Sequence, residues 1–173
     1  MTSYKEISKD LQEKIKRIKC VIFDFDGVFT NNKVYLDQNG IESVRCDRSD
    51  GMGIKILKSL GIDVLILSSE INSVVSMRAK KLKIECFYGV EDKLSQLNNI
   101  LDTKTLRTDQ VLYVGNDIND ADCLKAVGFP IVVRDSHPDV IDLGIYVTNS
   151  KGGNGAVREV SDLIEYYQND TTP

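Results

Sequence analysis

The sequence predicts an α/β fold in which a doubly wound, mostly parallel sheet carries helices on both faces. Short apolar runs of strand length alternate with stretches of helical periodicity along most of the chain. Several of these runs end in polar residues, as strands do at the carboxyl edge of an open sheet. No internal repeat, low-complexity tract or linker divides the 173 residues. We therefore expect one domain over residues 1–173, with right-handed crossovers between its parallel strands.

The first expected elements are a helix, a strand and a hairpin. Residues 3–18 place an apolar residue every three or four positions among charged ones, which is typical of an amphipathic helix that covers a sheet. Residues 21–23 are apolar without interruption and predict a strand buried on both faces. Residues 33–36 and 42–46 flank Asn39-Gly40, a pair that favours a hairpin turn. We expect this hairpin insertion to protrude from the domain.

The rest of the chain repeats a unit of strand, polar end and helix. Asp50-Gly51-Met52-Gly53 opens a helix that Gly61 ends, and residues 63–67 form the next buried strand. A glycine-rich segment and a helix close the chain over about residues 151–168. The remaining expected strands are residues 84–87, 111–114, 130–133 and 146–148, and the expected helices are residues 50–60, 72–81, 92–101, 121–127 and 154–167.

Composition and charge exclude several classes of partner. A hydrophobic content of 42% indicates a chain that can bury a core, and the net charge of −4 leaves no basic surface for nucleic acid. The four cysteines form no C-x-x-C pair, which indicates free thiols in a reducing cytoplasm. The first twenty residues are too charged for a signal peptide, and no apolar run reaches membrane-spanning length. We expect a cytoplasmic protein without nucleic-acid or membrane partners.

Polar side chains at the ends of three predicted strands indicate an active site. Asp24 and Asp26 follow the first strand, Ser68 follows the strand at 63–67, and Asp117 and Asp120 follow the strand at 111–114. A doubly wound sheet gathers such positions into one crevice. Carboxylate and carbonyl oxygens suit Mg²⁺, and a carboxylate can attack phosphorus to form an aspartyl-phosphate. The pattern therefore predicts phosphoryl transfer.

Taken singly, these residues have ordinary structural explanations. An isolated D-x-D is most often an acidic turn, Ser68 a helix cap and Lys93 a solvated lysine at a helix start. Their placement relative to the acids favours chemistry instead. A lysine ammonium neutralises the oxygens of a transferring phosphoryl group and a hydroxyl donates a hydrogen bond to it, so we expect Lys93 and Ser68 to hold that group.

These motifs together resemble the haloacid dehalogenase superfamily of phosphatases. They read D-F-D-G-V-F-T at 24–30, Ser68 at a strand end, Lys93, and G-N-D-I-N-D at 115–120. The resemblance covers nearly the whole chain and implies a Rossmann-like sheet. It implies that Asp24 is the nucleophile and that Asp26 is the general acid, which then activates water as a base.

The resemblance also implies the metal ligands. Asp24, the backbone carbonyl of Asp26 and Asp117 match the ligands of Mg²⁺, with Asp120 close by in support. The family often has two acids where this chain has Asn116-Asp117. We expect that difference to change the surroundings of the metal and to leave the metal site in place.

The similarity narrows to a branch without a cap domain that acts on 3-deoxy-2-ulosonic acid phosphates. Its marks are the hairpin at about 32–46, Asp50-Gly51-Met52-Gly53, Ser136-His137-Pro138 and residues 152–159. The branch implies a homotetramer in which hairpins meet and protomers cover one another's active sites, whereas a solvent-exposed flap is the alternative. Residues 152–155 are either a linker or a tail over the substrate. For His137 we expect a capping role rather than a catalytic one.

The expected substrate contacts are Gly27, Asp50, Ser69, Glu70 and Lys81. Octulosonate 8-phosphate phosphatases of the branch typically carry Thr-Gly-Arg where this chain has Ser68-Ser69-Glu70. The difference resembles enzymes of nine-carbon ulosonic acid 9-phosphates, so we expect a KDN- or N-acylneuraminate-type 9-phosphate, with the eight-carbon 8-phosphate as the alternative. Lys81 of an adjacent protomer is expected to pair with Glu70 or the substrate carboxylate, unless Lys80 faces the site instead.

Two other classes of function have sequence features in common with this chain. A response-regulator receiver also combines acids, a hydroxyl and a lysine on such a sheet, but its phosphoacceptor follows the third strand, where this chain has Tyr88-Gly89. A non-catalytic domain associated with an acylneuraminate cytidylyltransferase is the second alternative. Intact Asp24, Asp26, Lys93 and Asp117 argue against it.

Overall fold

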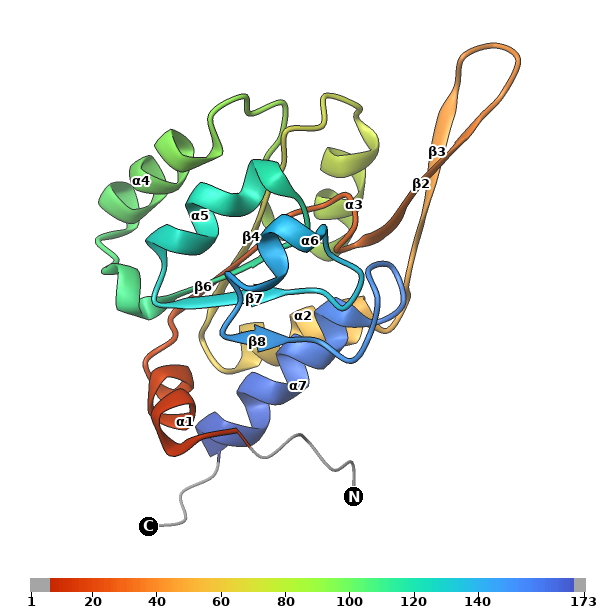
Figure 1. The fold of residues 1–173 in the computed structure, drawn as a ribbon. Helices are drawn as coiled ribbons and strands as arrows, with labels where there is room; N and C mark the ends of the chain where they lie inside the picture. Colours follow the sequence, from red (N-terminus) through yellow and green to blue (C-terminus); the bar gives the residue numbers. More distant parts are fainter. Residues whose placement is uncertain (1–6, 170–173) are drawn as a thin grey trace.

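The computed structural model describes residues 7–169, in which a six-stranded sheet lies between two layers of helices (Figure 1). The strand order is β5-β4-β1-β6-β7-β8, and all neighbours in this sheet are parallel. The strands are β1 Cys20–Phe23, β4 Asp63–Leu67, β5 Glu85–Phe87, β6 Val111–Gly115, β7 Phe129–Val132 and β8 Tyr146–Val147. The predicted doubly wound α/β fold is confirmed.

Helices follow most of the strands. They are α1 Lys9–Lys16, α2 Asp50–Ser59, α3 Val74–Leu82, α4 Lys93–Lys104, α5 Ala121–Ala126, α6 Pro138–Ile141 and α7 Ala156–Asn169, with short 3-10 turns at Thr108–Gln110 and Ile118–Asp120. None of the helices in the described part of the chain is long and apolar enough to cross a membrane.

The direction of the chain reverses at the centre of the sheet. From β1 the chain moves outward through β4 to β5, and it then returns to place β6 on the other side of β1. The loops after β1 and β6 therefore diverge and leave a crevice at the carboxyl ends of these strands, where open α/β sheets bind their ligands.

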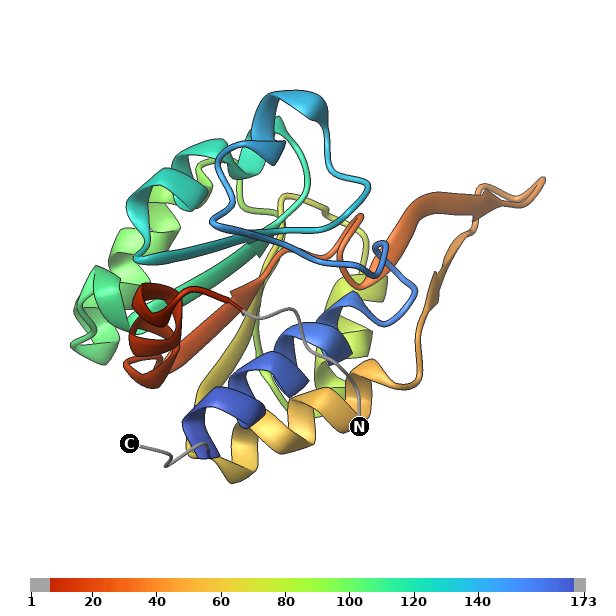
Figure 2. The same cartoon turned by 60° about the horizontal axis from the view of Figure 1, so that its bottom comes forward.

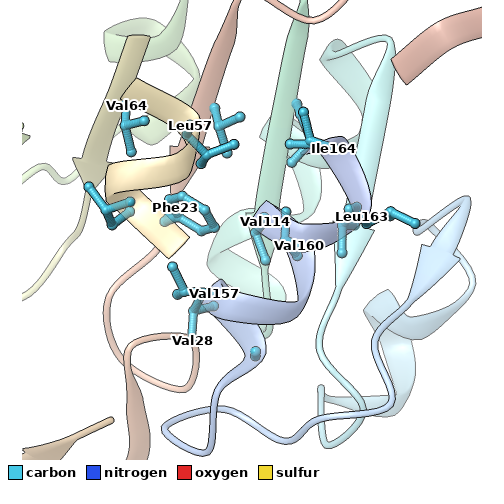
Figure 3. Packing of buried hydrophobic residues seen from close by; sticks show 14 of the residues in the cluster. Phe23, Val28, Leu57, Val64, Val114, Val157, Val160, Leu163 and Ile164 are labelled. Carbon is cyan, nitrogen blue, oxygen red and sulfur yellow. The ribbon is translucent and has the colours of Figure 1, made fainter. Parts of the chain in front are cut away.

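Alternate residues of each central strand enter two separate apolar layers. Val21 and Phe23 of β1 belong to the layer under α2 and α7, which lie side by side in Figure 2, and Figure 3 shows their packing. Cys20 and Ile22 enter the opposite layer, together with residues of α4 and α5. This alternation explains why the sequence of β1 is apolar at every position. The four cysteines are free, as expected.

The hairpin forms a second, two-stranded sheet that projects from the body of the molecule (Figures 1 and 2). It consists of β2 Thr30–Leu36 and β3 Glu42–Cys46. The Asp37 carboxylate accepts hydrogen bonds from the backbone N–H groups of Asn39 and Ile41, at 2.8 and 2.9 Å, and thereby closes the predicted turn. The hairpin is confirmed, and β2 begins three residues earlier than predicted.

Local caps move several helix boundaries away from their predicted positions. Helix α1 begins after Ser8, whose side chain accepts from the backbone N–H of Leu11, and residues 3–6 of the predicted helix lie outside the described residues. The Asn72 side chain likewise accepts from the N–H of Val74, where α3 begins. Positive φ angles at Gly153 and Gly155 delay the start of α7 to Ala156. These differences arise from side-chain and turn geometry that apolar periodicity does not report.

Candidate active site

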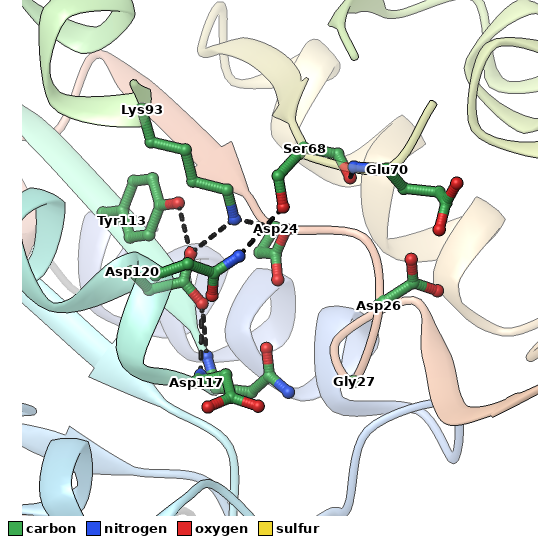
Figure 4. Close-up of polar contacts among 12 residues, drawn as sticks. Asp24, Asp26, Gly27, Ser68, Glu70, Lys93, Tyr113, Asp117 and Asp120 are labelled. Atoms are coloured by element: carbon green, nitrogen blue, oxygen red, sulfur yellow. Dashed lines mark hydrogen bonds and ion pairs between the residues drawn. The ribbon is translucent and has the colours of Figure 1, made fainter. Parts of the chain in front are cut away.

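A cavity of about 420 Å³ opens at the carboxyl ends of β1, β4 and β6. The polar residues that follow these strands supply most of its wall. The cavity is lined by Asp24, Asp26, Asn32, Ser68, Ser69, Glu70, Ile71, Asn116, Asp117 and Asn119. Of the residues that the sequence predicts for one crevice, Asp24, Asp26, Ser68 and Asp117 line the cavity, and the buried Asp120 does not (Figure 4).

Lys93 is a buried cation shared by two carboxylates. Its ammonium lies 2.8 Å from Asp24 Oδ1 and 2.7 Å from Asp120 Oδ1, and all three side chains are 5% exposed or less. Lys93 is the first residue of α4, and the Asp92 side chain caps that helix by accepting from the N–H of Ser95. The cap holds the first turn of α4 over the sheet, so that the lysine side chain reaches into the site. A solvated helix-start lysine is therefore excluded.

Burial changes the proton affinity of the groups around this cation. Burial raises the pKa of Asp24 above its usual range, and the neighbouring charge of Asp120 adds to this, while Lys93 opposes it. Burial alone lowers the pKa of Lys93, but the two carboxylates outweigh that effect and raise it. The network therefore keeps a full positive charge on Lys93 at neutral pH.

Asp26 lies in a different environment from Asp24. It is half-buried, and the Thr30 hydroxyl donates to its Oδ1 at 3.2 Å. Burial raises the pKa of the Asp26 carboxyl, the Thr30 hydrogen bond lowers it, and the negative charge of Glu70 raises it again. A carboxyl with a raised pKa at the edge of the cavity can carry and exchange a proton.

Gly27 allows the turn after Asp26 to pack against the loop that follows β6. Its φ is +81°, and a Cβ at this position would lie 1.9 Å from the Asn116 amide nitrogen. Gly27 therefore supports the site without lining the cavity. The amide oxygen of Asn116 is buried and accepts no hydrogen bond from the described residues.

The residues at the bottom of the cavity fit Mg²⁺. Asp24 and Asp117 bring carboxylates from the ends of two adjacent strands to the same cavity, and the backbone carbonyl of Asp26 adds a third hard oxygen. Asn116 also lines the cavity, although its amide oxygen is buried. No group of three histidine, cysteine or acidic residues in the described range forms a metal cage. Mg²⁺ takes few protein ligands and retains water, so two carboxylates and one carbonyl can suffice for it.

The loop after β4 supplies the opposite wall. Ser68 is buried, and its hydroxyl oxygen accepts from the backbone N–H of Glu70 at 3.1 Å. The Ser69 hydroxyl accepts from the Asn119 side-chain amide at 2.9 Å, which joins the loops after β4 and β6. Glu70 lines the cavity, while its Oε1 also accepts from the N–H of Asn72 at 2.7 Å.

Two expected substrate contacts lie elsewhere in this chain. Asp50 is fully buried at the start of α2, where its Oδ1 accepts from the N–H of Arg158 in the first turn of α7 at 3.2 Å. It therefore joins two helices and does not line the cavity. Lys80 and Lys81 are both exposed on α3 and neither lines the cavity. The prediction that Asp50 contacts the substrate is wrong, because its side chain turns into the contact between two helices. The contact of Lys81 with the site of an adjacent protomer stays a prediction.

The glycine-rich segment and His137 support the site from the side. The Gly153 N–H donates to the Val28 carbonyl at 3.0 Å, and the Gly152 N–H donates to Asp135 Oδ1 at 2.9 Å. His137 caps α6, as expected, because its Nδ1 accepts from the N–H of Asp139. Its own N–H donates to the Asn116 carbonyl at 2.8 Å. Both segments brace the loops that carry the acids.

Sequence reasoning missed Tyr113, which lies inside β6. Its ring is fully buried and its hydroxyl donates to Asp120 Oδ1 at 2.7 Å. The sequence did contain one indication of this role, a tyrosine in a strand that was expected to be buried on both faces. A buried tyrosine hydroxyl usually has a hydrogen-bond partner. Asn32 and Asn119 also line the cavity and were not predicted to do so.

Comparisons with known proteins agree with this geometry. A family model described as haloacid dehalogenase-like hydrolase matches residues 67–160. The 3-deoxy-D-manno-octulosonate 8-phosphate phosphatase KdsC of Yersinia pestis is 36% identical over 164 residues, which cover 94% of this chain and 88% of that protein.

Two solved structures extend the similarity to the fold. The octulosonate 8-phosphate phosphatase of Moraxella catarrhalis, in complex with a magnesium ion, a phosphate ion and a KDO molecule, superposes with a TM-score of 0.91 at 31% identity over 95% of both chains. The cobalt-bound enzyme of Haemophilus influenzae gives a TM-score of 0.85 at 32% identity, covering 90% of this chain and 91% of its own. All three relatives are named for an eight-carbon substrate. They favour the eight-carbon alternative over the nine-carbon substrate expected from Glu70.

We predict that Lys93→Met lowers the free energy of unfolding by about 3–5 kcal/mol, because it leaves two buried carboxylates without their cation. In this variant the pKa of Asp24 in the folded state rises further above its value in the unfolded chain. The folded state then binds more protons than the unfolded state, so the free energy of unfolding falls as pH rises. The loss should therefore be larger at pH 8 than at pH 5. Urea denaturation in EDTA at both pH values measures it.

Lys104→Met is the matched control for Lys93→Met. Lys104 also bridges two carboxylates, Glu85 at 2.9 Å and Asp63 at 3.5 Å, but both acids are about half exposed. Its loss should be about 1 kcal/mol or less at either pH. Equal losses in the two variants would contradict the importance of burial at Lys93.

Proposed function

The chain belongs to the haloacid dehalogenase-like hydrolases and is a Mg²⁺-dependent phosphatase of that family, and from this premise we propose that it hydrolyses a 3-deoxy-2-ulosonic acid phosphate. The observation that carries the proposal is the position of Asp24, which faces the cavity next to Asp26 while Lys93 holds its Oδ1 at 2.8 Å. This geometry supports a nucleophilic carboxylate with a proton donor beside it.

In the first half of the reaction, a carboxylate oxygen of Asp24 attacks phosphorus. A bond forms between that oxygen and phosphorus, and the bond from phosphorus to the sugar oxygen breaks. Asp26 gives its proton to the departing sugar oxygen, a role supported by the pKa that burial raises at this carboxyl. The Thr30 hydroxyl orients Asp26 through its hydrogen bond.

In the second half, water hydrolyses the aspartyl-phosphate. Asp26, now ionised, takes a proton from water as the water oxygen bonds to phosphorus. The bond between Asp24 and phosphorus breaks, which releases inorganic phosphate and restores the carboxylate. Asp26 thus acts as the general acid in the first half and as the general base in the second, and it ends the cycle protonated again.

The remaining polar groups are proposed to hold the phosphoryl group. Asp24, Asp117 and the Asp26 carbonyl would hold Mg²⁺, which supplies positive charge to the phosphoryl oxygens when bound. The Ser68 hydroxyl is available to donate to the phosphoryl group, since its oxygen accepts from Glu70 N–H. Lys93 provides a fixed positive charge at the nucleophile.

The eight-carbon 3-deoxy-D-manno-octulosonate 8-phosphate is the proposed substrate. The relatives named for this activity cover almost the whole chain, and no insertion within residues 7–169 provides a separate substrate-binding domain. Lysine and arginine are absent from the described residues that line the cavity, so a cation for the sugar carboxylate would have to come from beyond that wall.

Glu70 supports a second candidate, the nine-carbon ulosonic acid 9-phosphate. A glutamate in the cavity wall accepts hydrogen bonds from hydroxyl groups and repels a carboxylate, whereas arginine would bind one. Its Oε1 accepts from the Asn72 N–H, so in this candidate Oε2 is the oxygen that accepts from a hydroxyl group of the sugar. This candidate rests on Glu70 alone.

We also propose that the enzyme is a homotetramer assembled through its hairpins. Val34, Tyr35 and Leu36 of β2 and Ile41 of the turn before β3 are each more than half exposed. Such a surface favours association with another copy. Asn32, at the base of the hairpin, also lines the cavity, which would couple the position of the hairpin to the site.

We expect Asp24→Asn to reduce kcat by about 10⁴-fold or more, because an amide cannot act as the nucleophile. Asp26→Asn should reduce kcat by about 10²–10⁴-fold and leave Mg²⁺ affinity within a few-fold, since the backbone carbonyl remains. EDTA should abolish the activity and added Mg²⁺ should restore it. Steady-state kinetics and calorimetric Mg²⁺ titration measure these effects.

The control is Asp102→Asn, which changes an exposed acid on α4 and should leave the activity unchanged. Activity retained in Asp24→Asn would refute the mechanism.

For the substrate, we predict a kcat/KM for the eight-carbon 8-phosphate about tenfold or more above that for the nine-carbon 9-phosphate, because a misfitting carbon unit costs about that much. Parallel assays of both substrates test this. If the wild type instead prefers the nine-carbon substrate and Glu70→Ala loses that preference, the second candidate is right. Glu91→Ala, which changes an exposed glutamate that does not line the cavity, is the control.

For assembly, we predict a tetramer at about micromolar concentration in sedimentation velocity. Leu36→Asp places a charge on the exposed apolar surface of the hairpin and should lower both association and activity. Lys125→Asp, an exposed change on α5, should affect neither. A wild-type monomer with full activity would rule out this assembly.

A further inference from the structure

We propose that Tyr113 is a positioning residue of the phosphatase reaction, because its hydroxyl holds Asp120 in the one orientation that serves both Lys93 and the metal-binding loop. Tyr113 does not line the cavity and would not touch the substrate. The inference deepens the proposed function and rests on the phosphoryl-transfer roles given there to Asp24 and Asp117.

One oxygen of Asp120 joins Tyr113 to the nucleophile. Asp120 Oδ1 accepts from the Tyr113 hydroxyl at 2.7 Å and from the Lys93 ammonium, also at 2.7 Å (Figure 4). The same ammonium donates to Asp24 Oδ1 at 2.8 Å. The ammonium is therefore divided between two carboxylates, and Tyr113 supplies the second donor to one of them.

The other oxygen of Asp120 holds the loop after β6. Asp120 Oδ2 accepts from the backbone N–H groups of Asn116 at 2.9 Å and Asp117 at 3.2 Å. Asp117 carries one of the carboxylates that fit Mg²⁺. A rotation of the Asp120 carboxylate would thus disturb the metal-binding loop and the lysine together.

The surroundings leave Asp120 little freedom once the hydroxyl is in place. Asp120 and Tyr113 are both fully buried, so water does not substitute for a lost donor. A Cβ at Gly115 would lie 2.6 Å from the Asp120 Cβ, which shows that the aspartate packs directly on the end of β6. Without the hydroxyl, Lys93 would be the remaining donor to Oδ1 among the described residues. The ammonium would then be drawn from Asp24 toward Asp120.

Tyr113→Phe tests this role, because it removes one oxygen and keeps the ring that fills the core. Tyr146→Phe is the matched control: the Tyr146 hydroxyl donates to a different carboxylate, Glu159 Oε1, at 3.1 Å, outside the cavity. Both variants lose a hydroxyl that donates to a carboxylate, so a purely structural role predicts similar effects in both.

The measurements are kcat and KM, the Mg²⁺ dissociation constant from calorimetry of the free enzyme, and the melting temperature. Tyr113→Phe should lower kcat about tenfold and weaken Mg²⁺ binding about three- to tenfold, with a smaller change in KM, since a hydrogen bond to a buried charge is lost. Tyr146→Phe should stay within twofold of the wild type in kcat and Mg²⁺ affinity. Equal kcat and Mg²⁺ affinity in Tyr113→Phe and the wild type would overturn the proposal, as would equal losses in both variants.

A double-mutant cycle with Asp120→Asn provides the second test. If Tyr113 acts through Asp120, Tyr113→Phe should change Mg²⁺ affinity less than twofold in the Asp120→Asn background. If Tyr113→Phe weakens Mg²⁺ binding by the same factor in the wild-type and Asp120→Asn backgrounds, Tyr113 acts by another route and the proposal is overturned. The Mg²⁺ titrations use no sugar phosphate, so they distinguish failure of this inference from failure of the proposed substrate.

Discussion

The site depends on one buried cation between two carboxylates. The Lys93 ammonium lies within 2.8 Å of both Asp24 and Asp120, and none of the three side chains is more than 5% exposed. Removing such charges from water costs several kcal/mol each unless they are paired and hydrogen-bonded. The surrounding structure provides that pairing: Asp120 accepts four hydrogen bonds, and the capped first turn of α4 directs Lys93 into the site.

The fold supplies these partners because the chain reverses direction at the centre of the sheet. Asp24 follows β1 and Asp117 follows β6, and these strands are parallel neighbours even though nearly ninety residues separate them in sequence. Lys93 comes from a helix that packs on one face of the sheet. Gly153 donates to Val28 in the turn after β1, and Gly152 packs closely against Gly27 of the same turn. The proposed nucleophile Asp24, the buried cation Lys93 and the loop of Asp117, proposed to bind the metal, thus come from separate elements of the chain.

The wall of the cavity differs from this buried network in composition. Asp26, Glu70 and Asp117 line it together with neutral side chains, and its described residues include no lysine or arginine. An anionic sugar phosphate therefore needs Mg²⁺, Lys93 and a contribution from outside this wall to balance its charge. The exposed hairpin, whose base reaches the cavity at Asn32, makes a neighbouring protomer the natural source of that contribution in the proposed tetramer.

The sequence by itself determined the fold class, the positions of most strands and the acids at their ends, because apolar periodicity and strand-end polarity are local signals. It also identified Lys93 and Ser68 by their place after particular elements. Only the tertiary structure decided where side chains point. Asp50 turns into the contact between α2 and α7, and the Tyr113 hydroxyl turns out of an apolar strand toward Asp120. These outcomes depend on contacts between residues distant in sequence, which no local pattern records.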